Sequence, residues 1–438
     1  MTVSAAVARA AAFAPTIAGW DGARRRDTLH ALADALAAAS DQVVKVAAEE
    51  TGLTTARLTG ELDRTTGQLR LLGDYVAAGR HLPTRTSPGA GPGGTDIRQI
   101  VVPVGPVAVF AASNFPLAFG VLGGDTGAAL AAGCPVVVKA HPAHPALSDL
   151  LASIASGVLG DAFGLVSGGA DVSLALVGAP GVKAVGFTGS LRGGRALMDA
   201  AAARPEPIPV YAEMGSTNPV FVLPGAAADL TRAGALAAAV TGSAGQLCTK
   251  PGLVFVPSDA PEFAEALATE VAGTPVHRML TDGMAAAHAD WITTLTDAGR
   301  DVRVGPSDPA PVAVVIQAAD LTGALLEEHF GPAVVVVLAD PASYPALAGS
   351  LDGQLTATVH AALPADHEAA RTLVPVLAGK AGRVVWNGVP TGVAVVDAML
   401  HGGPWPATSA AWSTSVGTGA IERFQRPVAL QGVPADVL

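Results

Sequence analysis

Two α/β domains, each a doubly wound parallel sheet with helices on both faces, and a small arm are the fold that this sequence predicts. The chain has 438 residues and is 50% hydrophobic, which is enough to form more than one buried core. Short apolar runs alternate with stretches of helical periodicity from about residue 104 onward. These runs are apolar at consecutive positions, as expected of strands that are buried on both sides.

Residues 5 to 80 are expected to be helical. Leucines recur in this part of the chain at spacings of three, four and seven, as in Leu29, Leu32 and Leu36. Residues 81 to 95 are rich in proline and glycine, which predicts a loop or arm, and a stretch that favours β-structure follows at 97 to 112.

The first α/β domain is expected within residues 1–212, with the arm near 82–103. Strands are predicted at 104–112, 135–139, 182–187 and 208–212, and helices at 117–132, 146–159 and 191–203. Nucleotides bind such sheets at the carboxyl ends of the strands. This edge is therefore where we expect a cofactor.

A second α/β domain is expected over residues 213–402, followed by a C-terminal arm at 403–438. Strands are predicted at 220–223, 253–256, 312–316, 333–338 and 384–386, and helices at 226–242 and 261–271. The last segment carries Pro427 and Pro434, which suit a strand or arm that packs elsewhere.

Composition excludes several classes of protein. A net charge of -11 argues against a nucleic-acid partner, because phosphate binding needs clustered lysine and arginine. The longest apolar tract, 117–138, contains Asp125 and Pro135, so no membrane insertion is expected. Two cysteines and no secretory signal pattern suit a reducing compartment, and we expect the protein in the cytoplasm.

A glycine turn at 186–190 is the candidate phosphate site. The sequence has no Gly-x-Gly-x-x-Gly, but Gly-Phe-Thr-Gly-Ser ends an expected strand and opens a helix, with Gly189 and Ser190 at the helix start. Backbone N–H groups at such a place bind anions, although a plain strand-to-helix turn looks the same. Lys139 ends the preceding strand but one, where an adenosine ribose would lie. His141 and His144 are too few to hold a metal, and no metal is expected.

Cys248 is the candidate nucleophile. It is one of two cysteines and stands in Gly-Gln-Leu-Cys-Thr. Free cysteines are usually buried packing residues, and Cys134, just before a buried strand, fits that description. A thiolate attacks a carbonyl more readily when a cation is near, and Lys250 is a candidate for that cation.

The order of the motifs resembles the aldehyde dehydrogenase superfamily along nearly the whole chain. The runs are Ser-Asn-Phe-Pro with Asn114, Val-Lys with Lys139, Ala-Glu-Met-Gly with Glu213, Gly-Gln-Leu-Cys-Thr with Cys248, and Glu-His-Phe-Gly-Pro with Glu328. Several details resemble the 2,5-dioxovalerate (α-ketoglutarate semialdehyde) dehydrogenase group. These are Ala-Ser-Asn-Phe-Pro at 112–116, Lys-Ala-His-Pro at 139–142, Glu-Met-Gly-Ser-Thr-Asn-Pro at 213–219, Arg-Thr-Thr-Gly-Gln-Leu-Arg at 64–70, and the run from His401 to Thr408.

The resemblance implies a role for each candidate residue. Cys248 attacks the aldehyde, the Asn114 amide and the Cys248 N–H stabilise the oxyanion, and Glu213, with a raised pKa, activates water for thioester hydrolysis. The residues expected to bind the cofactor are Lys139, His141, Gly189, Ser190, Glu328 and Phe330. Pro142 stands where relatives commonly have a glutamate that binds the 2′-hydroxyl, so both NADP and NAD are expected as cofactors.

The reaction implied is oxidation of 2,5-dioxopentanoate to 2-oxoglutarate by a homodimer or homotetramer. Arg64 or Arg70, six apart on one predicted helix, is expected to bind the substrate carboxylate. The same group contains enzymes of broad specificity and enzymes for long-chain fatty aldehydes, which is the first alternative.

Two further readings stay open. The segment between Cys248 and Glu328 is short for the family, so the chain is alternatively a catalytically impaired binding or structural homologue. A cysteine hydrolase is the third reading. It would need a histidine base near Cys248 and no nicotinamide, so nucleotide binding separates the three.

Overall fold

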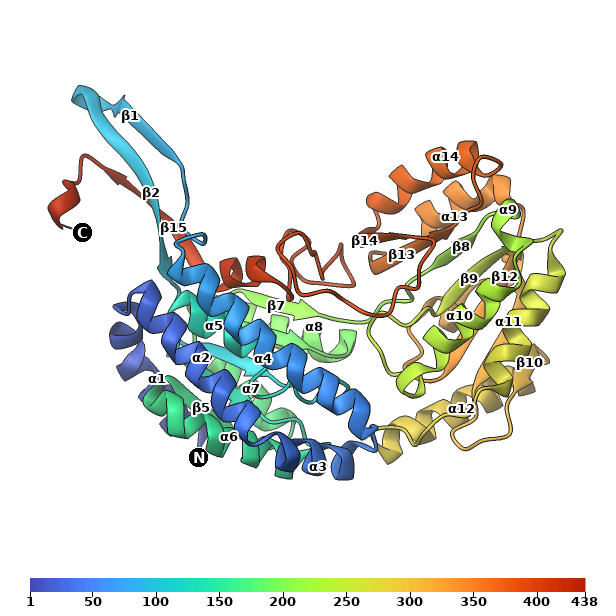
Figure 1. Ribbon diagram of the computed structural model, residues 1–438, viewed down its shortest axis with the longest axis horizontal. Helices are drawn as coiled ribbons and strands as arrows, with labels where there is room; N and C mark the ends of the chain where they lie inside the picture. Colours follow the sequence, from blue (N-terminus) through green and yellow to red (C-terminus); the bar gives the residue numbers. More distant parts are fainter. Residues whose placement is uncertain (438) are drawn as a thin grey trace.

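The computed structural model describes residues 1–437 and contains three sheets, of five, seven and three strands. Figure 1 shows the first two sheets in separate lobes and the third projecting as an arm from the N-terminal lobe. Each large sheet lies in its own α/β domain. The predicted fold class is therefore confirmed, and the arm is present.

Four helices form the N-terminal 80 residues, as predicted. They are α1 (Val3–Ala18), α2 (Gly22–Ala38), α3 (Ser40–Thr51) and α4 (Thr55–Ala77). Thr2, Asp21 and Thr54 cap the first, second and fourth of them, since each side chain accepts a backbone N–H of the first turn. The buried leucines of α2 and α4 face each other and join the core of the first sheet.

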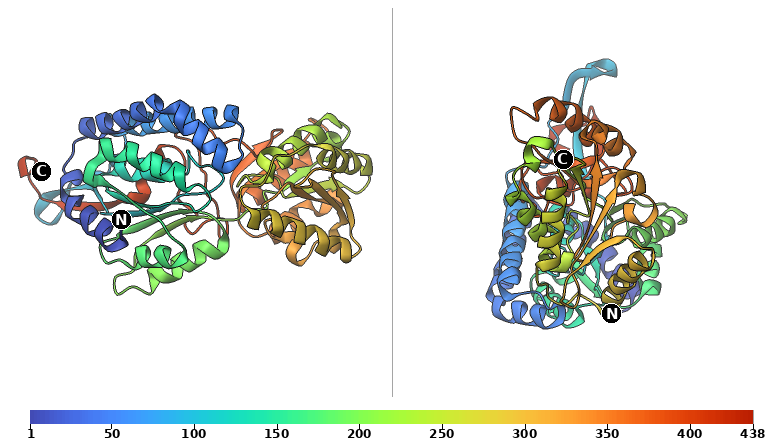
Figure 2. Two further views of the ribbon diagram at one scale, coloured as in Figure 1. Left: turned by 90° about the horizontal axis from the view of Figure 1, so that it is seen from below. Right: turned by 90° about the vertical axis from the view of Figure 1, so that its right-hand side faces the viewer.

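The first sheet is entirely parallel, with the order β5-β4-β3-β6-β7. Its strands are β3 (Val107–Phe110), β4 (Val136–Lys139), β5 (Phe163–Val166), β6 (Ala184–Thr188) and β7 (Val210–Glu213), and its helices are α5 (Gly124–Ala132), α6 (Pro145–Leu159), α7 (Ala170–Gly178) and α8 (Leu191–Ala202). The left view of Figure 2 shows helices on both faces. Four strands were predicted; β5 and α7 were missed because both are short and carry no clear period.

The helix predicted at 117–132 begins only at Gly124. Residues 115–123 form turns instead, because the Glu61 carboxylate of α4 accepts the N–H groups of Leu117 (2.8 Å) and Ala118 (2.9 Å). The Gly120 Cα lies so close to the Pro116 carbonyl that no Cβ would fit. A tertiary contact therefore overrides the helical pattern and shapes the segment that follows Asn114.

The second sheet has the order β10-β11-β12-β9-β8-β13-β14, and all pairs are parallel except that of the edge strand β10. The strands are β8 (Val220–Val222), β9 (Leu253–Pro257), β10 (Asp301–Val304), β11 (Val312–Gln317), β12 (Ala333–Ala339), β13 (Gln354–His360) and β14 (Ala381–Trp386). The helices are α9 (Pro224–Ala227), α10 (Thr231–Thr241), α11 (Pro261–Gly273), α12 (Asp282–Asp297), α13 (Tyr344–Ser350) and α14 (His367–Ala378).

One expectation for this domain was wrong, and strand β13 is among the elements that the sequence did not predict. The single helix predicted at 226–242 is broken, because Asp229 accepts the N–H and hydroxyl of Thr231 and starts a new helix. Strand β13 was missed because its Gln, Thr and His residues interrupt the apolar pattern. They are nevertheless buried, since Gln354 and Thr356 hydrogen-bond to residues 216–218.

The arm is an antiparallel sheet of β1 (Thr86–Gly91), β2 (Thr95–Pro103) and β15 (Gln425–Gln431). The C-terminal segment therefore joins the arm predicted near 82–103. Before it does so, the chain returns to the first domain, where Thr408 bridges Glu213 and a 3₁₀ segment (Thr418–Phe424) packs on α5. A buried ion pair between Arg423 and Asp125 (2.7 Å) fixes this return.

Among residues 1–437, no helix combines the length and the apolar character needed to cross a membrane.

Candidate active site

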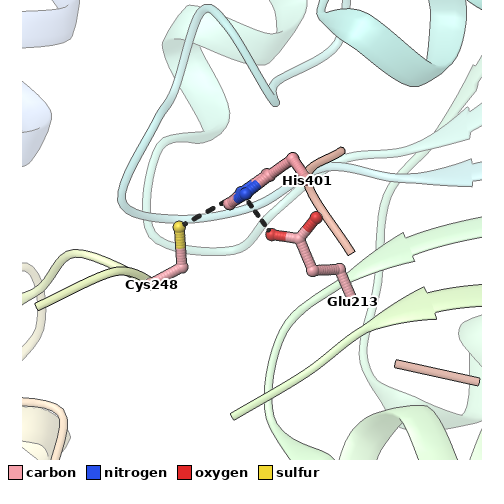
Figure 3. Close-up of side chains that lie close together, drawn as sticks. All are labelled: Glu213, Cys248 and His401. Carbon is pink, nitrogen blue, oxygen red and sulfur yellow. Dashed lines mark hydrogen bonds and ion pairs between the residues drawn. The ribbon is translucent and has the colours of Figure 1, made fainter. Parts of the chain in front are cut away.

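Three side chains from distant parts of the sequence meet between the two domains: Glu213, Cys248 and His401 (Figure 3). Glu213 is the last residue of β7, Cys248 lies in a turn after a 3₁₀ segment (Gly242–Gly245), and His401 lies in the returning C-terminal segment. His401 Nε2 is 3.6 Å from Cys248 Sγ and 2.9 Å from Glu213 Oε1. One imidazole nitrogen thus stands between thiol and carboxylate.

Glu213 and His401 form a buried pair. Burial by itself raises the pKa of Glu213, but His401 and hydrogen bonds from His401 and Ser415 outweigh it, so the pKa is lowered. Burial by itself lowers the pKa of His401, but Glu213 and Cys248 outweigh it, so that pKa is raised. The expected rise in the pKa of Glu213 is therefore wrong. The structure has an ion pair of Glu213 and His401 where the sequence predicted an isolated carboxyl group in an apolar pocket.

The loop that carries Cys248 is fixed by Asn218. Its Nδ2 donates to the carbonyls of Cys248 (2.8 Å) and Lys250 (2.9 Å), and its backbone is left-handed with φ 47°. Gln354 Oε1 in turn accepts the backbone N–H of Asn218 (3.0 Å). The Ser-Thr-Asn run that follows Glu213 is thus part of the framework that positions the cysteine.

The same loop packs on the Glu-His-Phe-Gly-Pro run at 328–332. Gly245 has φ +67°, and a Cβ there would overlap the Gly331 carbonyl, so only glycine fits. Lys250, expected to assist the thiolate, instead donates its buried ammonium to the Ala333 carbonyl (2.6 Å). Burial lowers the pKa of Lys250 to about 8, against the effect of Glu328. His401, not Lys250, is therefore the cationic group in contact with the thiol.

Asn114, the expected oxyanion donor, lies beside this loop. Its side chain is buried, and Nδ2 donates to the Gln246 carbonyl (3.0 Å), two residues before Cys248. Arg57 of α4 donates to the Asn114 carbonyl (2.8 Å). An amide N–H₂ has a second hydrogen, which leaves one donor for a substrate oxygen.

A cleft of about 900 Å³ opens between the domains, and both Ser190 and Glu328 line it. Ser190 caps α8 by accepting the Gly193 N–H (3.2 Å), and Gly189 lies against the Phe187 ring where a Cβ would not fit. This volume suits a ligand of nucleotide size, and the N-terminus of α8 suits a phosphate. Glu328 lies against Gly215, and burial raises its pKa to about 7, opposed by Lys250.

The remaining expected cofactor residues are not among those that line this cleft. Lys139 ends β4 and is buried, which lowers its pKa. His141 Nδ1 accepts the Ala143 N–H (3.1 Å), and burial, with His144 and Lys139, lowers its pKa to about 3. Phe330 is half-buried in a smaller neighbouring cavity.

Of the two arginines expected to bind a substrate carboxylate, the structure places only Arg64 near the reaction centre. Its guanidinium lies over the Phe119 ring (5.5 Å), and that ring is 6.2 Å from the His401 ring. Arg70 points to the surface, where it pairs with Asp34 (2.5 Å) and its side chain is 38% exposed.

Sequence reasoning missed His401 and Arg57. Arg57 stacks on Phe115 (4.8 Å), and its Nη1, like Nε of Arg64, is buried with no hydrogen-bond partner among the residues described. His401 opens the run 401–408, which contributed to the resemblance without being given a role. The proximity of Glu213 to this run is visible only in three dimensions.

Comparison with known proteins decides between the readings of this site. The model of the family described as "Aldehyde dehydrogenase family" matches residues 1–404. This chain belongs to the aldehyde dehydrogenase family. It is an oxidoreductase that acts on aldehydes.

Two curated relatives are similar along almost the whole enzyme. Alpha-ketoglutaric semialdehyde dehydrogenase 2 of Azospirillum brasilense is 46% identical, over 95% of this chain and 84% of the relative. Alpha-ketoglutaric semialdehyde dehydrogenase of Acinetobacter baylyi is 42% identical, over 95% and 83%. The predicted resemblance to this group is confirmed.

Solved structures agree on the fold. An NAD-dependent aldehyde dehydrogenase from Sinorhizobium meliloti superposes with a TM-score of 0.84 at 22% identity, over 99% of this chain and 88% of that one. A 3,6-anhydro-L-galactose dehydrogenase in complex with NAP gives 0.85 at 21% identity, over 97% and 90%.

Alkylation should distinguish the two cysteines. We expect iodoacetamide to modify Cys248 in the native enzyme and to spare Cys134, whose Sγ donates to the Phe424 carbonyl (3.3 Å) and whose pKa burial raises to about 11. His401→Ala should slow the reaction at Cys248 about tenfold or more at neutral pH, because the imidazolium that stabilises the thiolate is lost. Peptide mass spectrometry measures both, and equal labelling of the two cysteines would contradict this assignment.

Gly245→Ala should destabilise the enzyme by at least about 2 kcal/mol, through its left-handed backbone and the overlap with Gly331. The matched control is Gly234→Ala within α10, where a Cβ meets nothing, and a gain of about 0.5–1 kcal/mol is expected. Urea unfolding measures both. A Gly245→Ala variant as stable as the parent would show that the loop has room to move.

Proposed function

We propose that this enzyme oxidises 2,5-dioxopentanoate to 2-oxoglutarate with NADP or NAD. The observation that supports this substrate is a pair of arginines near the reaction centre. Arg57 stacks on Phe115 and Arg64 on Phe119, and each has a buried N–H group with no hydrogen-bond partner among the residues described. The Phe119 ring in turn lies next to the His401 ring. Arginine N–H groups that lack a partner in a low-dielectric site suit a carboxylate. The two curated relatives named as semialdehyde dehydrogenases support the same choice.

The first step is attack of Cys248 Sγ on the aldehyde carbon. Cys248 reacts as the thiolate after its proton has passed to solvent, and the His401 imidazolium, with Nε2 3.6 Å from the sulfur and 2.9 Å from Glu213, stabilises that thiolate. The carbonyl oxygen gains negative charge, which the free N–H of the Asn114 amide and the Cys248 backbone N–H stabilise. The product is a thiohemiacetal on Cys248.

Residues of the cleft, together with Lys139 at the end of β4, fit a nicotinamide dinucleotide, which when bound supplies the hydride acceptor. Ser190 and the start of α8 would hold its phosphates, Lys139 its adenosine ribose, and Glu328 its nicotinamide ribose. Loss of hydride from the thiohemiacetal leaves a thioester on Cys248. Phe330, beside Glu328, would limit the position of the nicotinamide ring.

Hydrolysis of the thioester completes the reaction. We assign Glu213 as the base that takes a proton from the attacking water, because its carboxylate is ionised and 4% exposed. The His401 imidazolium holds that carboxylate in position and stabilises the departing thiolate. The product is a free carboxylic acid.

We also propose a homodimer or homotetramer as the assembly. The arm of β1, β2 and β15 projects from the N-terminal lobe and offers strand edges to a second copy (Figure 1).

Arg64→Gln should raise KM for 2,5-dioxopentanoate about ten- to hundredfold, because a charge-assisted hydrogen bond of about 1.5–3 kcal/mol is lost. The same substitution should change KM for pentanal, which has no carboxylate, by less than about threefold. Steady-state kinetics with both aldehydes measure the difference.

Arg70→Gln is the matched control, and its kinetics should equal those of the parent enzyme. If long-chain aldehydes are preferred over 2,5-dioxopentanoate and Arg64→Gln leaves both unchanged, the long-chain alternative replaces this proposal.

Glu213→Gln should trap the thioester. A burst of about one reduced nicotinamide per active site should precede slow turnover, because hydride transfer needs Cys248 and hydrolysis needs the carboxylate. Stopped-flow absorbance and intact-mass spectrometry measure the burst and the acyl adduct. If the burst amplitude falls by the same factor as the steady-state rate, Glu213 acts before hydride transfer.

NADP should be used at least comparably to NAD, because Pro142 provides no carboxylate to repel a 2′-phosphate near Lys139. Pro142→Glu should lower kcat/KM for NADP roughly ten- to hundredfold by like-charge repulsion of about 1–3 kcal/mol, and should affect NAD less. A parent enzyme that rejects NADP would show that another residue recognises the ribose.

A further inference from the structure

We propose that Cys248, His401 and Glu213 form a binding site for a zinc ion, and that zinc bound there reversibly inhibits the enzyme. One ligand atom from each residue, a sulfur, a nitrogen and an oxygen, lies within 4.8 Å of the other two. Among residues 1–437, this is the one group of three such side chains with that spacing. Figure 3 shows that the three side chains point toward one another.

The distances are close to those of a tetrahedral site. With bonds of about 2.3 Å to sulfur and about 2.0–2.2 Å to nitrogen and oxygen, neighbouring ligand atoms are roughly 3.4–3.6 Å apart. Cys248 Sγ and His401 Nε2 are already 3.6 Å apart. Glu213 Oε1, at 2.9 Å from Nε2, must retreat by about half an ångström and approach the sulfur, which a rotation of its carboxylate allows.

The kind of donor selects the cation. Thiolate, imidazole and carboxylate together suit Zn²⁺, whereas Mg²⁺ and Ca²⁺ need sets of oxygen ligands. A thiolate and a carboxylate carry two negative charges, which a divalent cation neutralises. No resident metal is implied, because the same three groups serve the dehydrogenase reaction when the site is free.

Groups around the three ligands hold them in position for a metal. Ser415 donates its hydroxyl to Glu213 Oε2, which leaves Oε1 to face His401. The backbone N–H of His401 donates to Thr414 Oγ1 (2.9 Å), and Asn218 fixes the carbonyl of Cys248 (2.8 Å). Such outer contacts contribute about ten- to hundredfold to metal affinity in proteins.

The fourth coordination position of the zinc ion is expected on the side of Cys248, the least buried of the three ligands. Glu213 and His401 are 4% and 2% exposed, whereas Cys248 is only half-buried. A zinc ion bound here would hold the sulfur in a bond that prevents its attack on an aldehyde. It would also bind Glu213, the base that we assign to thioester hydrolysis. Both the attack on the aldehyde and the hydrolysis would therefore stop, and a chelator would restore them.

The test uses ZnCl₂ with the purified full-length enzyme freed of metal by chelation. Isothermal titration should show one Zn²⁺ per chain with a Kd on the order of micromolar or below, and MgCl₂ should show no binding. Cys248→Ser and His401→Ala should each weaken Zn²⁺ at least about a hundredfold. The matched controls Cys134→Ser and His277→Ala should keep the parent affinity, since Cys134 is buried elsewhere and neither residue belongs to the group of three ligands.

Two further measurements complete the test. Zn²⁺ should protect Cys248 from iodoacetamide in proportion to its occupancy, and EDTA should remove the protection. Aldehyde oxidation should fall with the same occupancy, and this part alone rests on the proposed function. Binding and protection without any dehydrogenase activity in the free enzyme would sink the proposed function but leave the zinc site. Binding that is unchanged in Cys248→Ser and His401→Ala, or absent below about 100 µM, would overturn the zinc site.

Discussion

The buried pair of Glu213 and His401 is the contact on which the rest of the active site depends. A carboxylate and an imidazole, each almost fully removed from water, are stable together because each supplies the charge that the other lacks. Either one left without the other would be a buried, unpaired polar group. The pair therefore ties the end of the first sheet to the returning C-terminal segment, and it places a cation at the thiol.

A second constraint is the position of the Cys248 loop between two rigid elements. Asn218, at the start of the second sheet, binds the carbonyls on both sides of Thr249, and Gly245 packs without a side chain on Gly331. The loop itself has left-handed residues at 243 to 245 and little intrinsic preference for this shape. Contacts from outside the loop hold it, which keeps the sulfur facing His401.

The open cleft follows from the arrangement of the two domains. Parallel strands bring all their carboxyl ends to one edge, and β4, β6 and β7 thus present Lys139, the Ser190 turn and Glu213 on the same side. Glu328, from the other domain, completes the cleft. The same architecture gives one fold a nucleotide site and a reaction centre that share a wall.

The sequence by itself determined the fold class, the two parallel sheets, the order of the motifs and the family, because apolar runs, helical periods and motif spacing are local properties. It also indicated Asn114, Glu213 and Cys248 as neighbours. The tertiary structure alone decided that the helix after Asn114 starts late, that β13 is a buried strand despite its polar residues, that Arg64 and not Arg70 approaches the site, and that His401 pairs with Glu213. Each of these results depends on a contact between segments far apart in the chain, and such contacts leave no trace in the local pattern.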